Sequence, residues 1–133
     1  MNTPAYHPLY LDGIERFNRG EYFESHEIWE TLWRGESGEA REFYKGLIQA
    51  AVALHHWRAG NVAGATTLWA RSRSRLCRYC PVFQGLNVER FMEQMAHRIT
   101  AVALPHEASK ARFPTICLGP GSGTPGGSQP PVA

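Results

Sequence analysis

His26, Glu27 and Glu30 are the residues of this sequence whose types and spacing point most directly to chemistry. They belong to the segment His-Glu-Ile-Trp-Glu, and a helix places His26 and Glu30 on one face because residues four apart are neighbours. An imidazole and a carboxylate at this spacing can both ligate a metal ion. The segment is close to the His-Glu-x-x-His motif of zinc proteases, but Glu30 replaces the second histidine, so a protease is only weakly indicated.

A helix predicted from Tyr22 to Trp33 must position these residues. At about 100° per residue, His26 and Glu30 fall within an apolar arc, whereas Glu27 lies on the opposite side. The arc consists, in order, of Leu32, Ser25, Trp29, Tyr22, Trp33, His26, Glu30 and Phe23. Charged groups are rarely buried without a partner. We therefore expect His26 and Glu30 to face inward and to meet polar groups of the next helix, chiefly Gln49 or His55.

Three interpretations of this polar site stay open. The first, which the residue types favour, is a structural hydrogen-bond network between two helices, because buried polar groups are normally paired. The second is a metal or small-ligand site, in which His26 and Glu30 hold a divalent metal ion as cofactor. The third is acid–base catalysis with Glu27 or Glu30 as the base. The sequence does not decide whether the protein is an enzyme.

Arg71, Arg75 and Arg78 form a second set, on one face of a predicted helix. Arginine clusters suit phosphate groups. Charge is also uneven along the chain: residues 12–42 hold nine acids and four arginines, whereas residues 43–88 hold six basic residues and no acid. Because no nucleic-acid motif or stacking platform accompanies the arginines, we interpret them as a solvated or salt-bridged face and disfavour nucleic acid as a partner.

Cys77 and Cys80 form an isolated Cys-x-x-Cys pair. A structural zinc site needs a second pair of ligands, and a thioredoxin-like role needs a neighbouring βαβ unit. We therefore interpret both as small buried cysteines near a helix end. Three cysteines without a visible signal peptide predict a reducing, cytoplasmic location. No window reaches the roughly 18 apolar residues of a membrane helix.

Glycine and proline divide the remainder into elements. Residues 1–8 are predicted to be an extended lead-in and residues 105–133 a disordered, low-complexity Pro/Gly-rich tail. Between them, residues 9–104 form one domain with helices expected at 9–18, 22–33, 39–59, 62–78 and 88–104, without strand alternation. Residues 17–25 and 57–65 repeat at a spacing of 40, with Gly20 and Gly60 making tight turns. We predict an all-α fold of about five helices in antiparallel, tetratricopeptide-like hairpins.

Three motifs together resemble a known family. They read Phe17-Asn-x-Gly-x-Tyr-Phe-Glu-x-His26-Glu27-x-Trp-Glu30-x-x-Trp33, Gly46-Leu-Ile-Gln49-x-Ala51 and Gly60-Asn61-x-x-Gly64-Ala65. In this order they resemble the domain of unknown function family numbered 309, over residues 9–78. The resemblance implies a compact helical bundle with characteristic polar positions at His26, Glu27, Glu30 and Gln49. It implies no activity.

The most favoured function is a non-enzymatic module that binds a protein or small ligand through the groove between its hairpins, with a polar site at His26, Glu27 and Glu30. The first alternative is a metal-dependent or acid–base enzyme at the same site. The second is RNA or phosphate binding through Arg71, Arg75 and Arg78. The sequence predicts no membrane partner and leaves homo-oligomer formation open.

Overall fold

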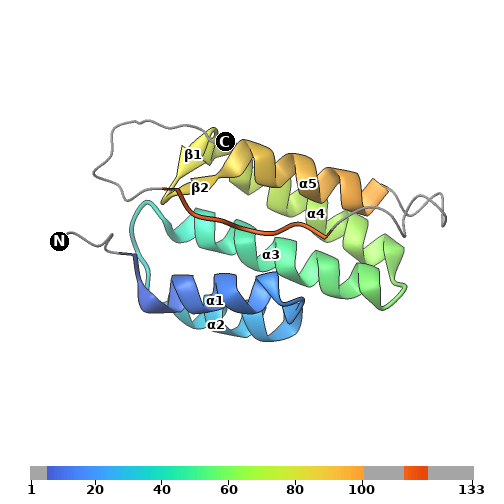
Figure 1. Ribbon diagram of the computed structural model, residues 1–133, viewed down its shortest axis with the longest axis horizontal. Coiled ribbons are helices and arrows are strands. Elements are labelled where there is room, and N and C mark those ends of the chain that lie inside the picture. The colour runs from blue at the N-terminus through green and yellow to red at the C-terminus, as the bar shows by residue number, and fades with distance from the viewer. Residues whose placement is uncertain (1–5, 101–112, 120–133) are drawn as a thin grey trace.

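The computed structural model describes residues 6–100 and 113–119, and these confirm the predicted all-α class (Figure 1). Within these residues the helices are α1 (Pro8–Asn18), α2 (Tyr22–Arg34), α3 (Arg41–Arg58), α4 (Val62–Leu76) and α5 (Val88–Thr100). A 3₁₀ helix η1 (Cys77–Tyr79) and the strands β1 (Val82–Phe83) and β2 (Leu86–Asn87) connect α4 to α5. None of the described helices is long and apolar enough to cross a membrane.

Two antiparallel helix hairpins, α1–α2 and α3–α4, form the framework. Gly20 and Gly60 end the first helix of each pair with φ values of +83° and +89°, a left-handed conformation that favours glycine. The next amide hydrogen-bonds back to the preceding helix, from Glu21 to Arg16 O at 2.9 Å and from Asn61 to His56 at 2.8 Å. The repeat of 40 residues thus corresponds to two similar helix-to-helix turns.

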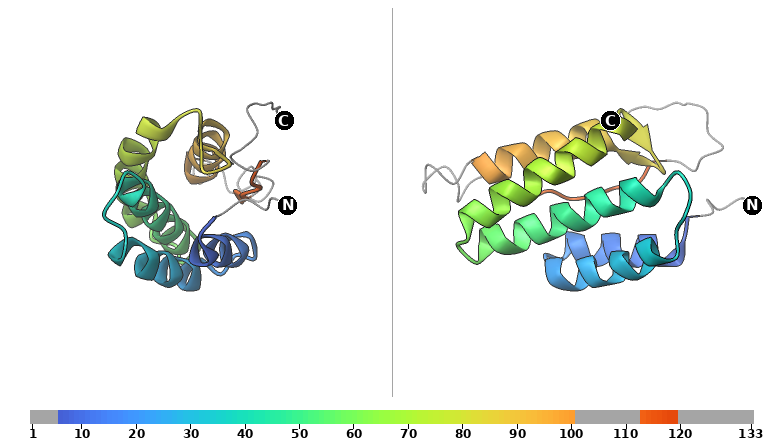
Figure 2. Two further views of the ribbon diagram at one scale, coloured as in Figure 1. Left: turned by 90° about the vertical axis from the view of Figure 1, so that its left-hand side faces the viewer. Right: turned by 180° about the vertical axis from the view of Figure 1, so that it is seen from behind.

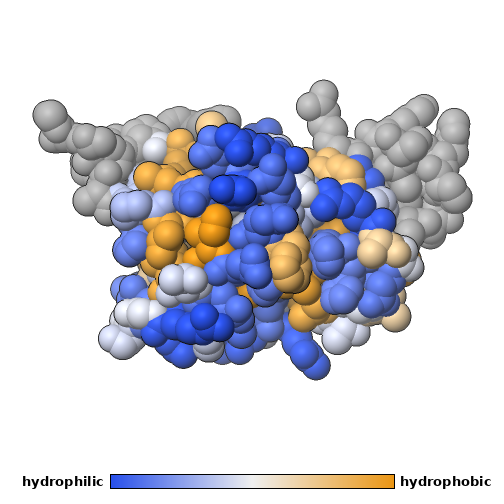
Figure 3. All heavy atoms as spheres, turned by 90° about the horizontal axis from the view of Figure 1, so that it is seen from below, coloured by the Kyte–Doolittle hydropathy of each residue, from blue (hydrophilic) through white to orange (hydrophobic). Residues whose placement is uncertain are grey.

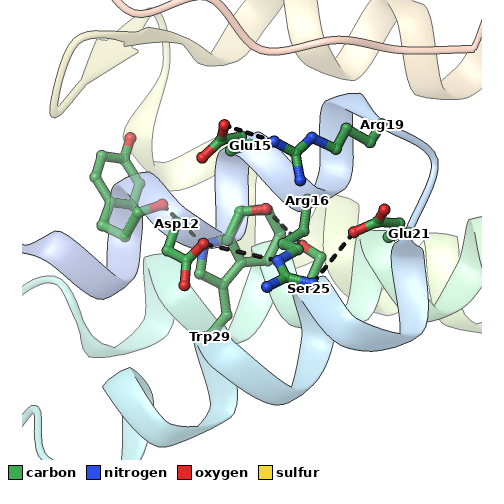
Figure 4. A network of polar contacts seen from close by, with 9 residues as sticks. Asp12, Glu15, Arg16, Arg19, Glu21, Ser25 and Trp29 are labelled. Atoms are coloured by element: carbon green, nitrogen blue, oxygen red, sulfur yellow. Dashed lines mark hydrogen bonds and ion pairs between the residues drawn. The ribbon is translucent and has the colours of Figure 1, made fainter.

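The α1–α2 hairpin is closely packed because Gly13 leaves room for a tryptophan. A Cβ at Gly13 would overlap the Trp29 indole, which is fully buried and donates from Nε1 to Tyr10 O at 3.2 Å. Ser25 Oγ donates to Gly13 O at 2.9 Å. Figure 4 shows Ser25 and Trp29 beside surface ion pairs, which charged residues of α1 form with one another and with Arg19 and Glu21 of the turn that follows.

The α3–α4 hairpin repeats this device. A Cβ at Gly46 would lie 2.7 Å from Leu76 Cδ2, and Ser72 Oγ donates to Gly46 O at 2.7 Å. In both hairpins, therefore, a glycine on the first helix accepts a bulky residue and a serine hydroxyl from the second. α3 lies centrally, with the α1–α2 pair on one side and α4 and α5 on the other (Figures 1 and 2).

The connection between α4 and α5 differs from the prediction of one helix to Arg78 and no strands. Chain direction changes at η1, and β1 and β2 pair antiparallel, with Phe83 opposite Leu86. Phe83 packs against Phe43 and Tyr79 at centroid distances of 4.8 and 4.7 Å. Strands of two residues are too short to show an alternating sequence pattern, so the sequence could not predict them. The packing of Phe83 against the helices stabilises this turn.

Residues 113–119, here called the strap, also differ from the prediction of a tail beginning at residue 105. The strap lies between α1 and α5 and completes the ring of helices (Figure 2, left). Pro114 and Ile116 are buried. Asn18 holds the Ile116 backbone on both sides, donating from Nδ2 to its carbonyl and accepting from its amide, each at 2.8 Å. The remainder of the predicted tail and most of the lead-in lie outside the described residues.

Candidate functional site

The polar residues of α2 lie along its edge toward α3 rather than in the core. Trp29 is fully buried, whereas the side chains of His26 and Glu30 keep 19% and 32% of their exposure. Glu27 is exposed, as the helical arc predicts. The predicted arc therefore faces the core, as expected. However, its most buried residue is Trp29, and His26 and Glu30 lie at the partly exposed border. As a result, His26 and Glu30 are accessible to a ligand.

Hydrogen bonding fixes the orientation of the His26 ring. His26 Nδ1 lies 2.9 Å from Phe23 O. Because a carbonyl oxygen only accepts, Nδ1 carries the hydrogen in this contact. His26 Nε2 then points toward Glu30 Oε1 at 3.8 Å, which is too far for a direct hydrogen bond. The same carboxylate oxygen lies 3.5 Å from Arg34 Nη2, whose side chain is 68% exposed.

His55 joins this site through an aromatic contact. The Phe23 ring lies 5.1 Å from the His26 ring and 5.6 Å from the His55 ring, centroid to centroid. Phe23 is nevertheless 47% exposed. Phe23, His26, Glu30 and His55 together are called the α2–α3 edge below. The helical periodicity places Phe23 on the same arc as His26. A phenylalanine on an apolar arc is expected to be buried, so the sequence did not predict its exposure at this site.

Gln49 is not brought to this edge. Its Oε1 accepts from Arg75 Nη1 at 3.2 Å, and Arg75 Nε also donates to Glu42 Oε1 at 2.8 Å. On α3, Gln49 lies on the side that faces α4, together with Glu42. Gln49 therefore ties α3 to α4 and does not pair with His26 or Glu30.

At the C-terminal end of α2, Trp33 makes cation–π contacts with α3 that the sequence analysis did not predict. Arg41 Cζ and Lys45 Nζ lie 4.0 and 4.5 Å from the centroid of the Trp33 ring. Arg41 Nη1 also donates to Trp33 O at 3.0 Å and to Glu36 O at 2.8 Å. Such cation–π contacts stabilise a helix pair. Spacing alone does not predict them, because they join residues across a turn.

Comparison with known proteins covers the same part of the chain that holds this edge. Residues 10–68 match the family model of DUF309, a domain of unknown function. This confirms the family resemblance that the motifs predict. The match runs from α1 into α4 and includes all four residues of the α2–α3 edge.

Two relatives of this DUF309 region are uncharacterized proteins. YpuF of Bacillus subtilis (strain 168) is 42% identical over 69 residues, which are 50% of this chain and 40% of YpuF. A protein of Aquifex aeolicus (strain VF5) is 30% identical over 73 residues, which are 54% of this chain and 22% of that protein. The chain thus spans less than half the length of either relative, and their names describe no activity.

The three arginines lie beyond the DUF309 match and do not act as a set. Arg71 and Arg78 are exposed. Arg75 is half-buried and bonds to Glu42 and Gln49, as described above. Arg78 belongs to η1 because α4 ends at Leu76. The helical face predicted to carry all three is therefore interrupted after Arg75.

The metal-ligating capacity of the edge is limited to two side chains. In residues 6–100 and 113–119, no group of three or more His, Cys, Asp or Glu residues is arranged to hold a metal ion. His26 Nε2 and Glu30 Oε1 are separated by 3.8 Å, so they can serve as a pair. Any further ligands of an ion bound there would come from water or from a ligand.

Proposed function

We propose that the DUF309 region is a binding module that recognises a cationic group of a partner protein at the α2–α3 edge. The observation that supports this is the orientation of His26. With Nδ1 engaged by Phe23 O, the neutral ring presents a lone pair at Nε2. Glu30 presents a carboxylate oxygen 3.8 Å away. Both atoms are hydrogen-bond acceptors, and one cationic donor can bond to the two together, beside the exposed Arg34 that already lies 3.5 Å from Glu30 Oε1.

An ammonium group fits this pair of acceptors. A nitrogen placed about 2.9 Å from each atom has the geometry of two ordinary hydrogen bonds. The half-exposed Phe23 ring lies beside the pair and can contact the cation through its face. The exposed carboxylates of Glu24 and Glu27 on the same helix add negative charge. Figure 3 shows that the α1–α2 side is largely hydrophilic, with smaller apolar areas between the polar residues.

We infer a lysine side chain as the group that binds. Its compact ammonium can reach two acceptors on one side, whereas the planar guanidinium of arginine matches a single bidentate carboxylate. Its methylenes can also cover the apolar surface of Phe23. We further propose that the protein works in a reducing compartment such as the cytoplasm, because Cys77, Cys80 and Cys117 are free thiols.

A divalent metal ion is the second candidate ligand, and the same geometry favours it. A histidine that ligates a metal through one nitrogen usually donates its other N–H to a carbonyl or carboxylate, as His26 does to Phe23 O. Glu30 supplies an oxygen ligand one helical turn away. In that case Glu30 is used as a ligand, and the exposed Glu27 is the candidate base of this helix for an acid–base reaction.

Nuclear magnetic resonance titration of the ¹⁵N-labelled protein distinguishes these ligands. We expect N-acetyl-lysine amide to shift amide signals of α2 and of the end of α3, while N-acetyl-norleucine amide, which lacks the ammonium, leaves them unchanged. His26→Ala and Glu30→Gln should remove the response. Glu89→Gln, an exposed acid on α5, is the matched control and should retain it.

Three results would contradict the proposal. Equal shifts with the norleucine compound would show that the contact is not cationic. Shifts caused by zinc at micromolar concentration, without a response to lysine, would establish the metal instead. The absence of any response to lysine or zinc would leave His26 and Glu30 with a structural role.

A further inference from the structure

Two sulfur atoms meet where η1 joins α5, outside the DUF309 match, and a second cysteine begins η1. Cys80 Sγ lies 3.7 Å from Met92 Sδ, and Met92 belongs to α5. Cys77 is the first residue of η1, and the Cys80 amide hydrogen-bonds back to Cys77 O at 3.4 Å. Cys80 follows η1 directly as its C-terminal cap. The two cysteines therefore stand at the two ends of one short turn.

Both cysteines of the pair are exposed free thiols, so the interpretation of buried cysteines is wrong. The reason is that α4 ends at Leu76, and η1 then carries the chain over the surface. Cys77 Sγ donates to Ser74 O at 3.3 Å, which a rotation about its side-chain bonds can release. Partial burial raises the pKa of the Cys80 thiol, and the negative charges of Glu89 and Cys77 raise it further.

We propose that Cys77, Cys80 and Met92 form a binding site for Cu(I). Thiolate and thioether sulfurs are soft ligands that select Cu(I). A structural zinc ion instead takes four ligands from cysteine, histidine and carboxylate side chains, and methionine is not among them. Met92 is therefore the residue that distinguishes this site from an incomplete zinc site.

The distance between the Cys80 and Met92 sulfurs fits a three-coordinate metal ion. If the metal–sulfur bonds are about 2.3 Å, as for zinc thiolates, a planar trigonal site places its sulfurs about 4 Å apart. Cys80 Sγ and Met92 Sδ are already 3.7 Å apart. The turn is also held in place: Tyr79 Oη donates to Glu39 O at 2.9 Å, and the Tyr79 ring packs against Phe43 at 5.3 Å. Binding thus needs rotation of Cys77 rather than refolding of η1.

Binding exchanges protons for the metal without electron transfer. Cys77 and Cys80 each lose the thiol proton to solvent, and the two thiolates with the Met92 thioether bind Cu(I) supplied in the reduced state. The bound group carries one negative charge. Because the ligands bind as thiolates, we expect Cu(I) binding to release two protons per chain.

Competition with a chromophoric Cu(I) chelator tests the site, with untagged, fully reduced protein under anaerobic conditions. We expect one tightly bound Cu(I) per chain. Cys77→Ser and Cys80→Ser should each weaken binding at least tenfold, and Met92→Leu, which has a similar volume, should weaken it severalfold. Cys117→Ser is the matched control, since Cys117 is also an exposed free thiol. Circular dichroism checks that each variant is folded.

Several outcomes would overturn the proposal. A loss in Cys117→Ser equal to that in Cys77→Ser would indicate unspecific thiol binding. Wild-type affinity in Met92→Leu would exclude the thioether, as would an X-ray absorption spectrum of the copper complex with only two sulfur neighbours. Zinc that displaces Cu(I) at equal concentration would identify a different metal.

Discussion

Replacement of Ile116 with alanine tests whether the strap belongs to the folded domain. Ile116 is 3% exposed and contributes to the hydrophobic core that α1, α3 and α5 share. Its backbone is bound on both sides by Asn18, 98 residues earlier in the chain. The substitution removes apolar contacts and leaves these backbone hydrogen bonds available.

The expected loss follows from the buried surface. Three carbon atoms leave the core, and at about 0.8 kcal/mol for each buried methylene this amounts to about 2.4 kcal/mol. A cavity adds to the loss where the surroundings cannot relax. We therefore expect the free energy of unfolding to fall by about 2–3 kcal/mol.

Urea unfolding followed by tryptophan fluorescence measures this loss. With a slope of about 1.5 kcal/mol per molar urea, the midpoint should fall by about 1.3–2 M. Thr115→Ala is the control, because Thr115 is exposed in the same strap and its replacement should change stability by less than about 0.5 kcal/mol. Equal midpoints for the two variants would show that the strap does not stabilise the domain, and the packing argument would fail.

Three other predictions concern the bundle itself. Gly13→Ala should lower the free energy of unfolding by about 2–3 kcal/mol in urea titrations, because the added Cβ overlaps Trp29. Gly35→Ala, at φ −90°, should be neutral or slightly stabilising, because its Cβ would make only an ordinary contact with Leu32 O at 3.8 Å. Burial raises the pKa of all five tyrosines, so above about pH 10 the unfolded chain ionises first. Stability should therefore fall as pH rises beyond that value, and Tyr10→Phe should reduce the slope measured in urea at several pH values. Arg75→Ala should cost about 1–2 kcal/mol by thermal denaturation, because it leaves the buried Gln49 without its partner; Arg73→Ala, at an exposed position, should have little effect.

The helices and their pairing could be predicted because the signals are local. A glycine directly after a stretch with helical periodicity indicates the C-terminal end of a helix. Gly20 and Gly60 both stand at such positions and have positive φ. The direction of the α2 arc likewise follows from periodicity, since Trp29 is buried and Glu27 is exposed. Both predictions depend on residues within a few positions of one another.

The partners of the polar residues could not be predicted in the same way. Gln49 bonds to Arg75, 26 residues later, and Asn18 bonds to Ile116. Nothing near these residues indicates which distant group satisfies them. The strap shows the same difficulty: its buried residues Pro114 and Ile116 stand in a stretch whose Pro/Gly content is typical of disorder. Its order comes from the burial of these two residues against the helices and from the hydrogen bonds of Asn18, which are not local in sequence.

The bond between Asn18 and Ile116 has a consequence during synthesis. A ribosome that adds about 5–20 residues per second needs roughly 5–20 s to make the 98 residues that separate the two. Late in that interval the α1–α2 and α3–α4 hairpins have been synthesised and can form their own contacts, but the nascent chain has no strap. The apolar positions that Pro114 and Ile116 later cover are then open to chaperones and to neighbouring chains. Translation that stops before residue 113 would release a bundle with this groove permanently uncovered.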